Sequence, residues 1–249
     1  MPNPGILDDL KRIALEAGRI AQAERQPDAF TLKPDGSIVT RGDVQVERFL
    51  RDALPALVPG STVWGEEEGH AGEGPEGLWC VDPVDGTSNY AHGSPLWGVS
   101  IALVRAEAEL GAIYLPDLKE LFLAARGHGA FFNDSPIAPI EAGPIEPFHL
   151  VSYSEHVLPH IPLQRLPGKM RCSGAFVVDG AFTVLGRYRG LIGVREKLYD
   201  IAATLALASE VGADIRFASG EPMSMSDLKL DRPVGRPWVV FPRDSGFFA

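Results

Sequence analysis

Four short apolar runs between residues 97 and 132 follow one another with turn sequences between them. The runs are WGVSIALV, ELGAIYL, ELFLAA and GAFF, and the segments around them contain Gly, Pro-Asp or Asn-Asp, which are typical of turns. Each run has the length of a strand, and consecutive strands joined by short turns pair antiparallel. The sequence therefore predicts an antiparallel sheet in this part of the chain.

Helical patterns and further strands occur on both sides of this sheet. Apolar residues recur at helical spacing from Ile6 to Ala21, and Asp43 precedes a second such pattern. Between these two patterns, residues 31–43 contain Pro-Asp-Gly and are interpreted as a hairpin or loop. Two more helices are predicted at about 175–185 and 199–211, and strands near 148–152, 190–194 and 237–241. This interleaving is typical of a layered α/β fold.

The chain of 249 residues is long enough to form one large domain or two closely associated lobes. Residues 141–147, EAGPIEP, are the best candidate boundary because they are rich in Pro, Gly and charge. We therefore expect a single domain with one lobe in residues 1–140 and a second in residues 141–249.

Composition excludes several classes of protein. The chain is 45% hydrophobic with a formal net charge of −10, which argues against a nucleic-acid polymer as partner. No run reaches the roughly 18 apolar residues of a membrane span, and the acidic N-terminus is unlike a signal peptide. We therefore expect a cytoplasmic protein without a membrane partner. Cys80 and Cys172 form no disulfide framework or zinc motif.

The segment DPVDGTSNY at residues 82–90 directly follows the apolar run LWCV. Pro83 and Gly86 restrict and redirect the backbone, so that Asp82 and Asp85 can point into one small space. Two carboxylates that close repel unless a cation lies between them, and Mg²⁺ prefers such oxygen ligands. A helix that begins near Thr87 would offer its N–H groups to a phosphate. The structural alternative is a type I turn with Asp at its first position.

Two further acidic positions are ambiguous when each is considered alone. Residues 66–68 are three consecutive glutamates, usually a solvated loop, but they also follow an apolar run, STVW. If the runs before residues 66 and 82 are parallel neighbours, both acidic clusters lie at the same sheet edge. Asp200 precedes an apolar helix, where Asp is most often an N-cap.

Together, WGEEEG, DPVDGTSNYAHG and LYDIAATLALASEVGA resemble, in order and spacing, the motifs of the inositol monophosphatase family, and KPDGSIVTRGD resembles its early loop. The resemblance covers most of the chain. It implies an α/β/α/β/α sandwich of the inositol monophosphatase and fructose-1,6-bisphosphatase type, usually dimeric. It also implies two or three Mg²⁺ ions, with Mn²⁺ as a substitute, and inhibition by lithium.

Carried over by motif, the resemblance assigns metal binding to Glu66, Asp82, Asp85, Asp200 and the carbonyl of Val84. Thr87 and Asp43 match the family's pair near the attacking water, with Glu66 as a further catalytic group. The substrate contacts implied by the matching segments are Gly86, Thr87, Ser88, Gly174, Ala175 and Arg195.

The substrate segment RCSGAF departs from the family pattern. Ala175 replaces a hydroxyl residue, bulky Phe176 follows it, and Gly193 stands where inositol-hydrolysing members carry glutamate, with Arg195 and Glu196 nearby as substitutes. We therefore expect a phosphomonoesterase for a small polyol or sugar phosphate, not specifically inositol phosphate. The alternatives are a histidinol-phosphate or 3′-phosphonucleotide phosphatase, or a catalytically idle relative that binds metal and phosphate. The tail after residue 237 lacks the family's final helix.

Overall fold

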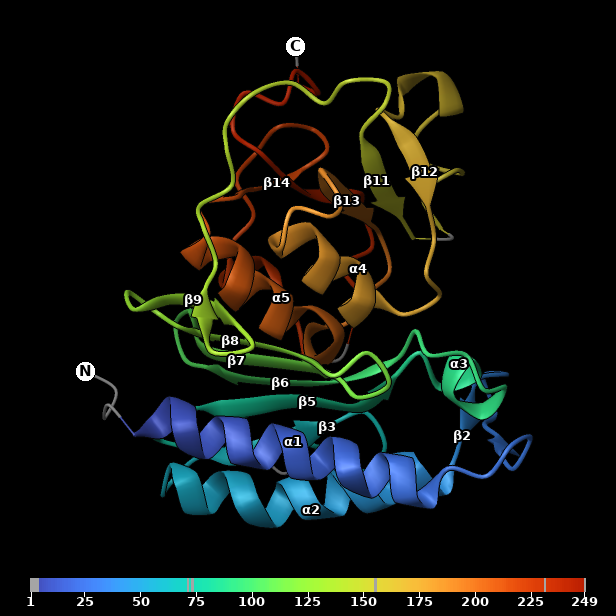
Figure 1. The fold of residues 1–249 in the computed structure, drawn as a ribbon, viewed down its shortest axis with the longest axis vertical. Coiled ribbons are helices and arrows are strands. Elements are labelled where there is room, and N and C mark those ends of the chain that lie inside the picture. The colour runs from blue at the N-terminus through green and yellow to red at the C-terminus, as the bar shows by residue number, and fades with distance from the viewer. Residues whose placement is uncertain (1–4, 71, 73, 155, 231, 249) are drawn as a thin grey trace.

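The computed structural model describes residues 5–70, 72, 74–154, 156–230 and 232–248. It contains two sheets, a small hairpin and five α-helices within this part of the chain (Figure 1). No helix in the described ranges is both long and apolar enough to cross a membrane.

The larger sheet has eight strands in the order β10-β9-β8-β7-β6-β5-β3-β4. The four apolar runs of residues 97–132 form β6 to β9, which pair antiparallel as predicted. Only β3 and β5 are parallel, with Gly65 opposite Val81. The strands are β3 (Thr62–Gly65), β4 (Gly69–His70), β5 (Leu78–Asp85), β6 (Gly98–Val104), β7 (Ala108–Leu115), β8 (Glu120–Ala125), β9 (Gly129–Phe132) and β10 (Ser135–Pro136).

Helices α1 (Ile6–Glu24) and α2 (Arg41–Leu57) cover one face of this sheet (Figure 1). Their apolar residues recur every three or four positions, as a face packed on a sheet requires, and the fully buried ones include Leu10, Ala14, Val46 and Leu50. The hairpin of β1 (Thr31–Leu32) and β2 (Ile38–Val39) joins the two helices. Thr40 caps α2, so the helix begins two residues before Asp43.

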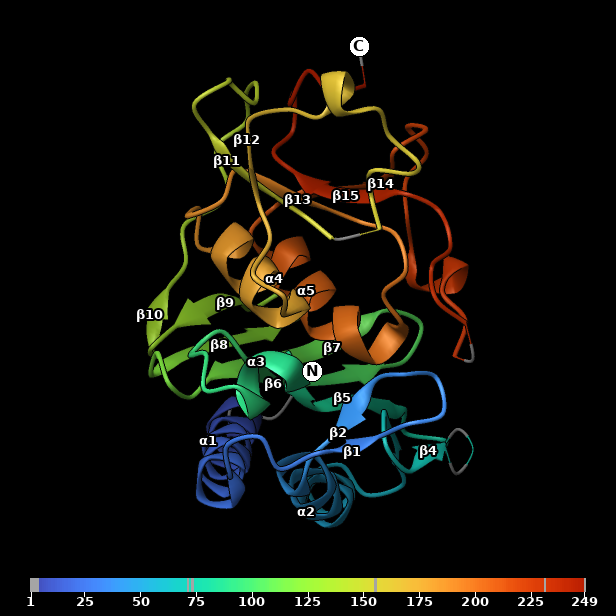
Figure 2. The same cartoon turned by 90° about the vertical axis from the view of Figure 1, so that its right-hand side faces the viewer.

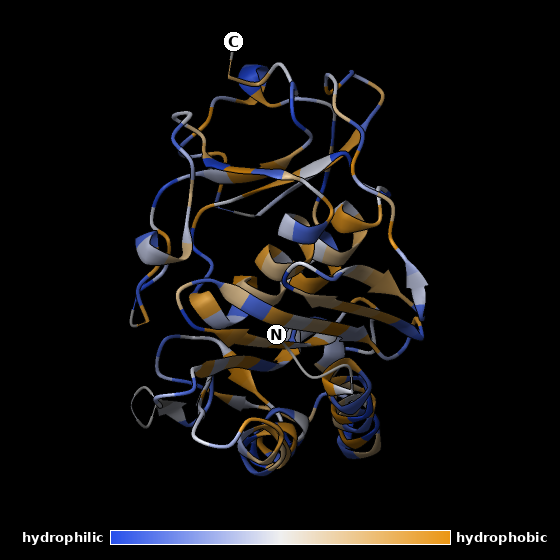
Figure 3. Cartoon of the chain, turned by 90° about the vertical axis from the view of Figure 1, so that its left-hand side faces the viewer, coloured by the Kyte–Doolittle hydropathy of each residue, from blue (hydrophilic) through white to orange (hydrophobic). Residues whose placement is uncertain are grey.

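The other face of the large sheet carries helices α4 (Phe176–Val184) and α5 (Leu198–Glu210), which the second sheet covers from the far side (Figure 2). Both helices are apolar on nearly all sides because they pack between two sheets. Figure 3 shows this hydrophobic middle layer. The second sheet contains β12 (Lys169–Arg171), β11 (Leu150–Tyr153), β13 (Gly190–Gly193), β15 (Trp238–Phe241) and β14 (Asp214–Phe217), in that order.

These layers confirm the predicted α/β sandwich. On the outer face of the second sheet, the described residues form loops and a short 3₁₀ turn (Leu163–Arg165) instead of α-helix (Figure 1). Val157 and Ile161 from this segment pack on the sheet residues Val151 and Val239. In the described residues, loops and this 3₁₀ turn therefore cover the outer face of the second sheet.

The interpretation of residues 82–86 as a turn after a strand was wrong in one respect. Strand β5 continues through Pro83 to Asp85, and its register against β6 shifts between Asp82 and Asp85. Proline is tolerated here because β3 ends at Gly65, so this part of β5 has β6 as its single partner strand. The bulge, rather than a turn, directs the two aspartates.

Candidate functional site

The acidic side chains predicted from sequence gather at one edge of the large sheet. Because β3 and β5 run parallel with Gly65 opposite Val81, Glu66, which directly follows β3, lies next to Asp82 in β5. Burial, and next the charge of Glu66, raises the pKa of Asp82 well above its ordinary value. Burial and the charge of Asp85 do the same for the pKa of Asp200. Residues separated by more than 130 positions thus share one electrostatic environment.

In each of the three aspartates, one carboxylate oxygen accepts a hydrogen bond from a backbone N–H group. Val84 N donates to Asp82 Oδ1 at 3.0 Å, and Val177 N donates to Asp85 Oδ2. Asp200 occupies the third position of α5, where its Oδ2 accepts the Lys197 N–H at 2.6 Å. Asp200 is therefore not the N-cap residue that the sequence alternative proposed, because Lys197 has that position. Asp200 accepts a capping hydrogen bond from within the helix and also lies beside the other carboxylates.

Asp85 is held in this buried position at a cost to its ionised form. Burial raises the pKa of Asp85 to about 7, although the hydrogen bond from Val177 N opposes that shift. Within the described ranges, no Lys or Arg forms an ion pair with Asp82, Asp85 or Asp200. A group of like charges largely withdrawn from water is unfavourable without a cation, so the site calls for bound cations.

A cationic side chain, Lys33 of the β1–β2 hairpin, lies beside the acidic group. Its Nζ lies 3.1 Å from Glu66 Oε1 and 2.6 Å from Glu67 Oε1. Burial raises the pKa of Glu67 to about 7, against the opposing effect of Lys33. Lys33 was not singled out from the sequence. Its position in the KPDGSIVT stretch, next to a predicted hairpin turn, was the available signal.

Thr87 and Asp43 meet at the opposite side of the bulge. The Thr87 hydroxyl lies 3.2 Å from Asp43 Oδ1 and 3.0 Å from the carbonyl oxygen of Val84. Asp43 is fully buried, and burial raises its pKa to about 6. Its Oδ2 accepts hydrogen bonds from the backbone N–H and hydroxyl of Thr40. This arrangement fixes Asp43 and leaves Oδ1 for the threonine.

Gly86 connects the bulge to the short helix α3 (Thr87–Ala91). Its φ of +82° is unfavourable for residues with a Cβ, and a Cβ placed there would lie 2.6 Å from the Cβ of Ala175. The close approach brings the segment 173–176 against the start of α3. Asn89 strengthens it by donating from Nδ2 to the carbonyl oxygen of Ser173 at 2.8 Å.

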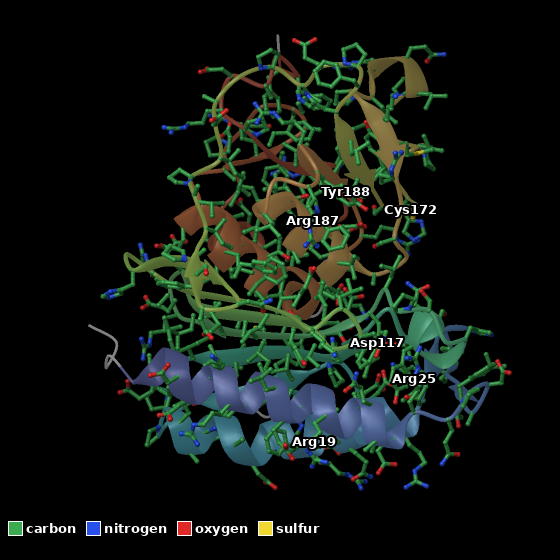
Figure 4. All side chains as sticks on the ribbon, viewed as in Figure 1. Arg19, Arg25, Asp117, Cys172, Arg187 and Tyr188 are labelled. Carbon is green, nitrogen blue, oxygen red and sulfur yellow. The ribbon has the colours of Figure 1, made fainter. Side chains whose placement is uncertain are left out.

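A cavity of about 620 Å³ adjoins the acidic group. It contains four of the predicted substrate residues and Asp200 at one end; Gly86 and Thr87 are not among its lining residues. The exposed Cys172, labelled in Figure 4, is one of its lining residues. Sequence reasoning missed Asn89 and Asp179. The lining residues are Ser88, Asn89, Ser154, His156, Cys172, Gly174, Ala175, Phe176, Asp179, Arg195, Glu196 and Asp200.

Glu196 takes up the space beside Gly193. Its Oε2 accepts the indole N–H of Trp238 at 2.9 Å, and a Cβ on Gly193 would lie 2.4 Å from the same oxygen. Glu196 is 9% exposed, whereas Arg195 is exposed at the cavity. A carboxylate therefore does line the cavity near residue 193, but it belongs to Glu196.

The donor set fits a hard divalent cation. It consists of oxygen atoms only and is largely withdrawn from water, with Asp82 buried and the other side chains partly buried. It also carries more negative charge than the neighbouring Lys33 balances. In the part of the chain that the structure describes, no group of three or more His, Cys, Asp or Glu side chains is placed so that it could hold a metal ion. The existing hydrogen bonds from Val84, Val177 and Lys197 orient the carboxylates separately.

Comparison with known proteins identifies the family of the chain. Residues 7–239 match the model of the inositol monophosphatase family. A fructose-1,6-bisphosphatase/inositol-1-monophosphatase of Aquifex aeolicus is 31% identical over 89% of both chains. A histidinol-phosphatase of Chlorobaculum parvum is 42% identical over 106 residues, which are 42% of this chain and 41% of that protein.

The fold of the chain is also similar to that of solved members of this family. A solved inositol monophosphatase of Thermotoga maritima superimposes with a TM-score of 0.79 and 26% identity, over 94% of this chain and 90% of that one. Because the family match spans nearly the whole described chain, the chain belongs to the inositol monophosphatase family.

Proposed function

We propose that the protein is a Mg²⁺-dependent phosphomonoesterase that acts on a small polyol or sugar phosphate. Members of the family are phosphatases that use Mg²⁺. The observation that carries the proposal is the cation-poor group formed by the buried Asp82 and the partly buried Asp85 and Asp200. This group lies beside the Thr87–Asp43 pair and an open cavity. Such a combination is suited to hydrolysis by an activated water molecule.

Glu66, Asp82, Asp85, Asp200 and the carbonyl of Val84 are the residues that we propose hold the ions. Bound Mg²⁺ would lower the pKa of a water molecule and stabilise charge on the phosphate ester. Two or three ions, with Mn²⁺ as a substitute, suit this number of oxygen donors.

The residues of the chain then orient and deprotonate the water. When the Thr87 hydroxyl donates to Asp43 Oδ1, its own oxygen is free to accept a hydrogen bond from the water. Glu66 is the proposed acceptor of the water proton, and Lys33 keeps its side chain in place. The N–H groups of Gly86 and Thr87 are proposed to bind the phosphate oxygens.

The residues that line the cavity determine which alcohol part of a phosphate ester can bind. Ala175 offers no hydroxyl and Phe176 presents an aromatic ring. The cavity wall nearest α4 therefore favours an apolar part of the substrate over a hydroxyl group. Glu196 supplies an acceptor on another wall: its Oε1 has no hydrogen-bond partner among the described residues. A substrate with a hydroxyl or amino group near the phosphate would satisfy that oxygen.

A second candidate substrate class is an amino-alcohol phosphate such as histidinol phosphate. The specific observation in its favour is the pair of buried carboxylates, Asp179 and Glu196, on the cavity wall. Carboxylates that are withdrawn from water favour a cationic ligand group. The partial likeness to a histidinol-phosphatase is in keeping with this class.

The test is release of inorganic phosphate from a panel of polyol, sugar, amino-alcohol and 3′-nucleotide phosphates with Mg²⁺. The wild type is compared with Asp85→Asn and with Asp52→Asn, an exposed position on α2. We expect Asp85→Asn to lose activity and Asp52→Asn to retain it. Equal activity of the wild type and Asp85→Asn would overturn the proposal. Calorimetric binding of an ester without turnover would favour a catalytically idle relative.

A further inference from the structure

A fully buried carboxylate, Glu47, lies on α2 one helical turn after Asp43. Both of its oxygens accept hydrogen bonds from the loop that follows β3. Glu67 N donates to Oε2 at 2.8 Å, and Glu68 N donates to Oε1 at 2.9 Å. Glu47 therefore binds the backbone of the two residues that directly follow Glu66.

Arg51 completes this arrangement from the next turn of the helix. Its Nε and Nη2 lie 3.0 and 2.7 Å from Glu47 Oε1. The same guanidinium donates to the carbonyl oxygens of Val63 in β3, at 3.2 Å, and Gly69 in β4, at 2.6 Å. Arg51 thus balances the charge of Glu47 and contacts the loop on both sides of Glu66.

Gly65 makes the close packing possible. A Cβ at this position would lie 2.2 to 2.6 Å from the carboxyl atoms of Glu47. The backbone before Glu66 is consequently pressed against the carboxylate, and the backbone after it is hydrogen-bonded to the same group. Glu47 thus contacts the backbone on both sides of Glu66.

We infer that Glu47, supported by Arg51, is a positioning residue that sets where the Glu66 carboxylate lies relative to the three aspartates. The inference rests on the proposed function in so far as Glu66 is a metal ligand. Since α2 also carries Asp43, one helix then positions both Asp43 and, through Glu47, the Glu66 loop. Groups that orient a metal ligand typically affect metal affinity by about 10- to 100-fold when they are changed.

The test uses Glu47→Gln, which keeps the shape of the side chain but replaces one acceptor oxygen with a donor NH₂ group facing the loop. Mn²⁺ binding to the metal-free protein is measured by calorimetry, beside phosphate release and thermal unfolding. We expect about 10- to 100-fold weaker Mn²⁺ binding. On a Glu66→Gln background the same change should have little further effect on Mn²⁺ affinity, because both act through one carboxylate.

Ser61→Ala is the matched structural control. Ser61 lies just before β3 and accepts the indole N–H of Trp79 at 3.0 Å, so its loss lowers stability without reaching the loop. We expect it to lower the unfolding temperature while Mn²⁺ affinity stays unchanged. If Glu47→Gln fails to fold, Gly65→Ala tests the same contact by placing a methyl group against the carboxylate, and it should weaken Mn²⁺ binding likewise.

The inference would be overturned if folded Glu47→Gln bound Mn²⁺ as tightly as the wild type. It would also be overturned if Glu47→Gln weakened Mn²⁺ binding equally in the wild type and on the Glu66→Gln background. A wild type that binds Mn²⁺ but releases phosphate from no ester would instead refute the proposed activity. In that case the effect of Glu47→Gln on Mn²⁺ binding still decides the positioning role.

Discussion

The hydroxyl of Thr87 lies 3.2 Å from Asp43 Oδ1, although 44 positions separate the two residues in the sequence. Asp43 cannot rotate away, because Thr40 donates two hydrogen bonds to its other oxygen. The hydroxyl proton thus has two acceptors, Asp43 and the Val84 carbonyl. If Val84 binds a cation, its carbonyl becomes a poorer acceptor and the proton goes to Asp43.

The first prediction follows from this pair. Thr87→Val removes the hydroxyl that orients the water while keeping the side-chain shape, and we expect kcat to fall by about 100-fold, as for a misplaced reactant. Thr87→Ser should retain most of the activity because the hydroxyl remains. The measurement is steady-state phosphate release at saturating Mg²⁺. Similar kcat values for the valine and serine variants would show that the hydroxyl has no such role.

A second prediction concerns the stability of the metal-free protein as a function of pH. The pKa of Asp85 is raised to about 7 in the folded chain, so the folded state binds a proton that the unfolded chain releases near pH 4. This contribution to stability is fully present below about pH 4 and is lost as the pH rises through about 7. Between pH 8 and 6, Asp85 alone is worth on the order of 1 kcal/mol, or about 2–4 °C in Tm.

Thermal unfolding in the presence of a chelator, at pH 6 and pH 8, measures this effect. The Asp85→Asn variant should show a smaller difference between the two pH values than the wild type. Excess Mg²⁺ should stabilise the wild type more at pH 8, where the carboxylates are ionised and can bind it. An identical pH dependence for the two proteins would contradict the raised pKa of Asp85.

The gathering of Glu66 and Asp82 was predictable because each follows an apolar run, and parallel strands bring their carboxyl ends to one edge. Asp200 required the family resemblance, since an Asp at the start of a helix serves equally well as a cap. The structure shows it in a capping hydrogen bond and in the acidic group together.

Residues whose importance depends on a three-dimensional contact were missed. Glu47 has the sequence pattern of an ordinary residue in an amphipathic helix, and only its burial under the Glu66 loop distinguishes it. The strand through Pro83 was missed for a related reason. Proline argues against a strand with two partners, and the sequence does not show that β3 ends early enough to leave β5 with β6 alone.

A third prediction tests the wall formed by Glu196. Glu196→Gln can still accept the Trp238 N–H through its amide oxygen, so the wall keeps its shape but loses its charge. We expect kcat/KM to fall by about 10- to 100-fold for an ester whose amino or hydroxyl group binds Glu196. An aryl phosphate without such a group should be unaffected. Equal losses for both substrates would argue against a direct contact.

A fourth prediction isolates the contact between Gly86 and Ala175. Gly86→Ala has to adopt a φ of +82° and also brings a methyl group to 2.6 Å from Ala175 Cβ. Gly93 has the same φ of +82° with no atom near the corresponding position. Gly93→Ala therefore carries the backbone strain of about 1–3 kcal/mol without the collision.

We expect the two alanine variants to lose comparable stability from strain, and Gly86→Ala alone to lose phosphatase activity as well, because the collision displaces the start of α3 and with it Thr87. Adding Ala175→Gly to Gly86→Ala removes the opposing methyl group, and activity should partly return. Denaturant unfolding and phosphate release on all four proteins separate the two effects. If Gly93→Ala loses as much activity as Gly86→Ala, or if Ala175→Gly restores none, the close approach does not position the threonine.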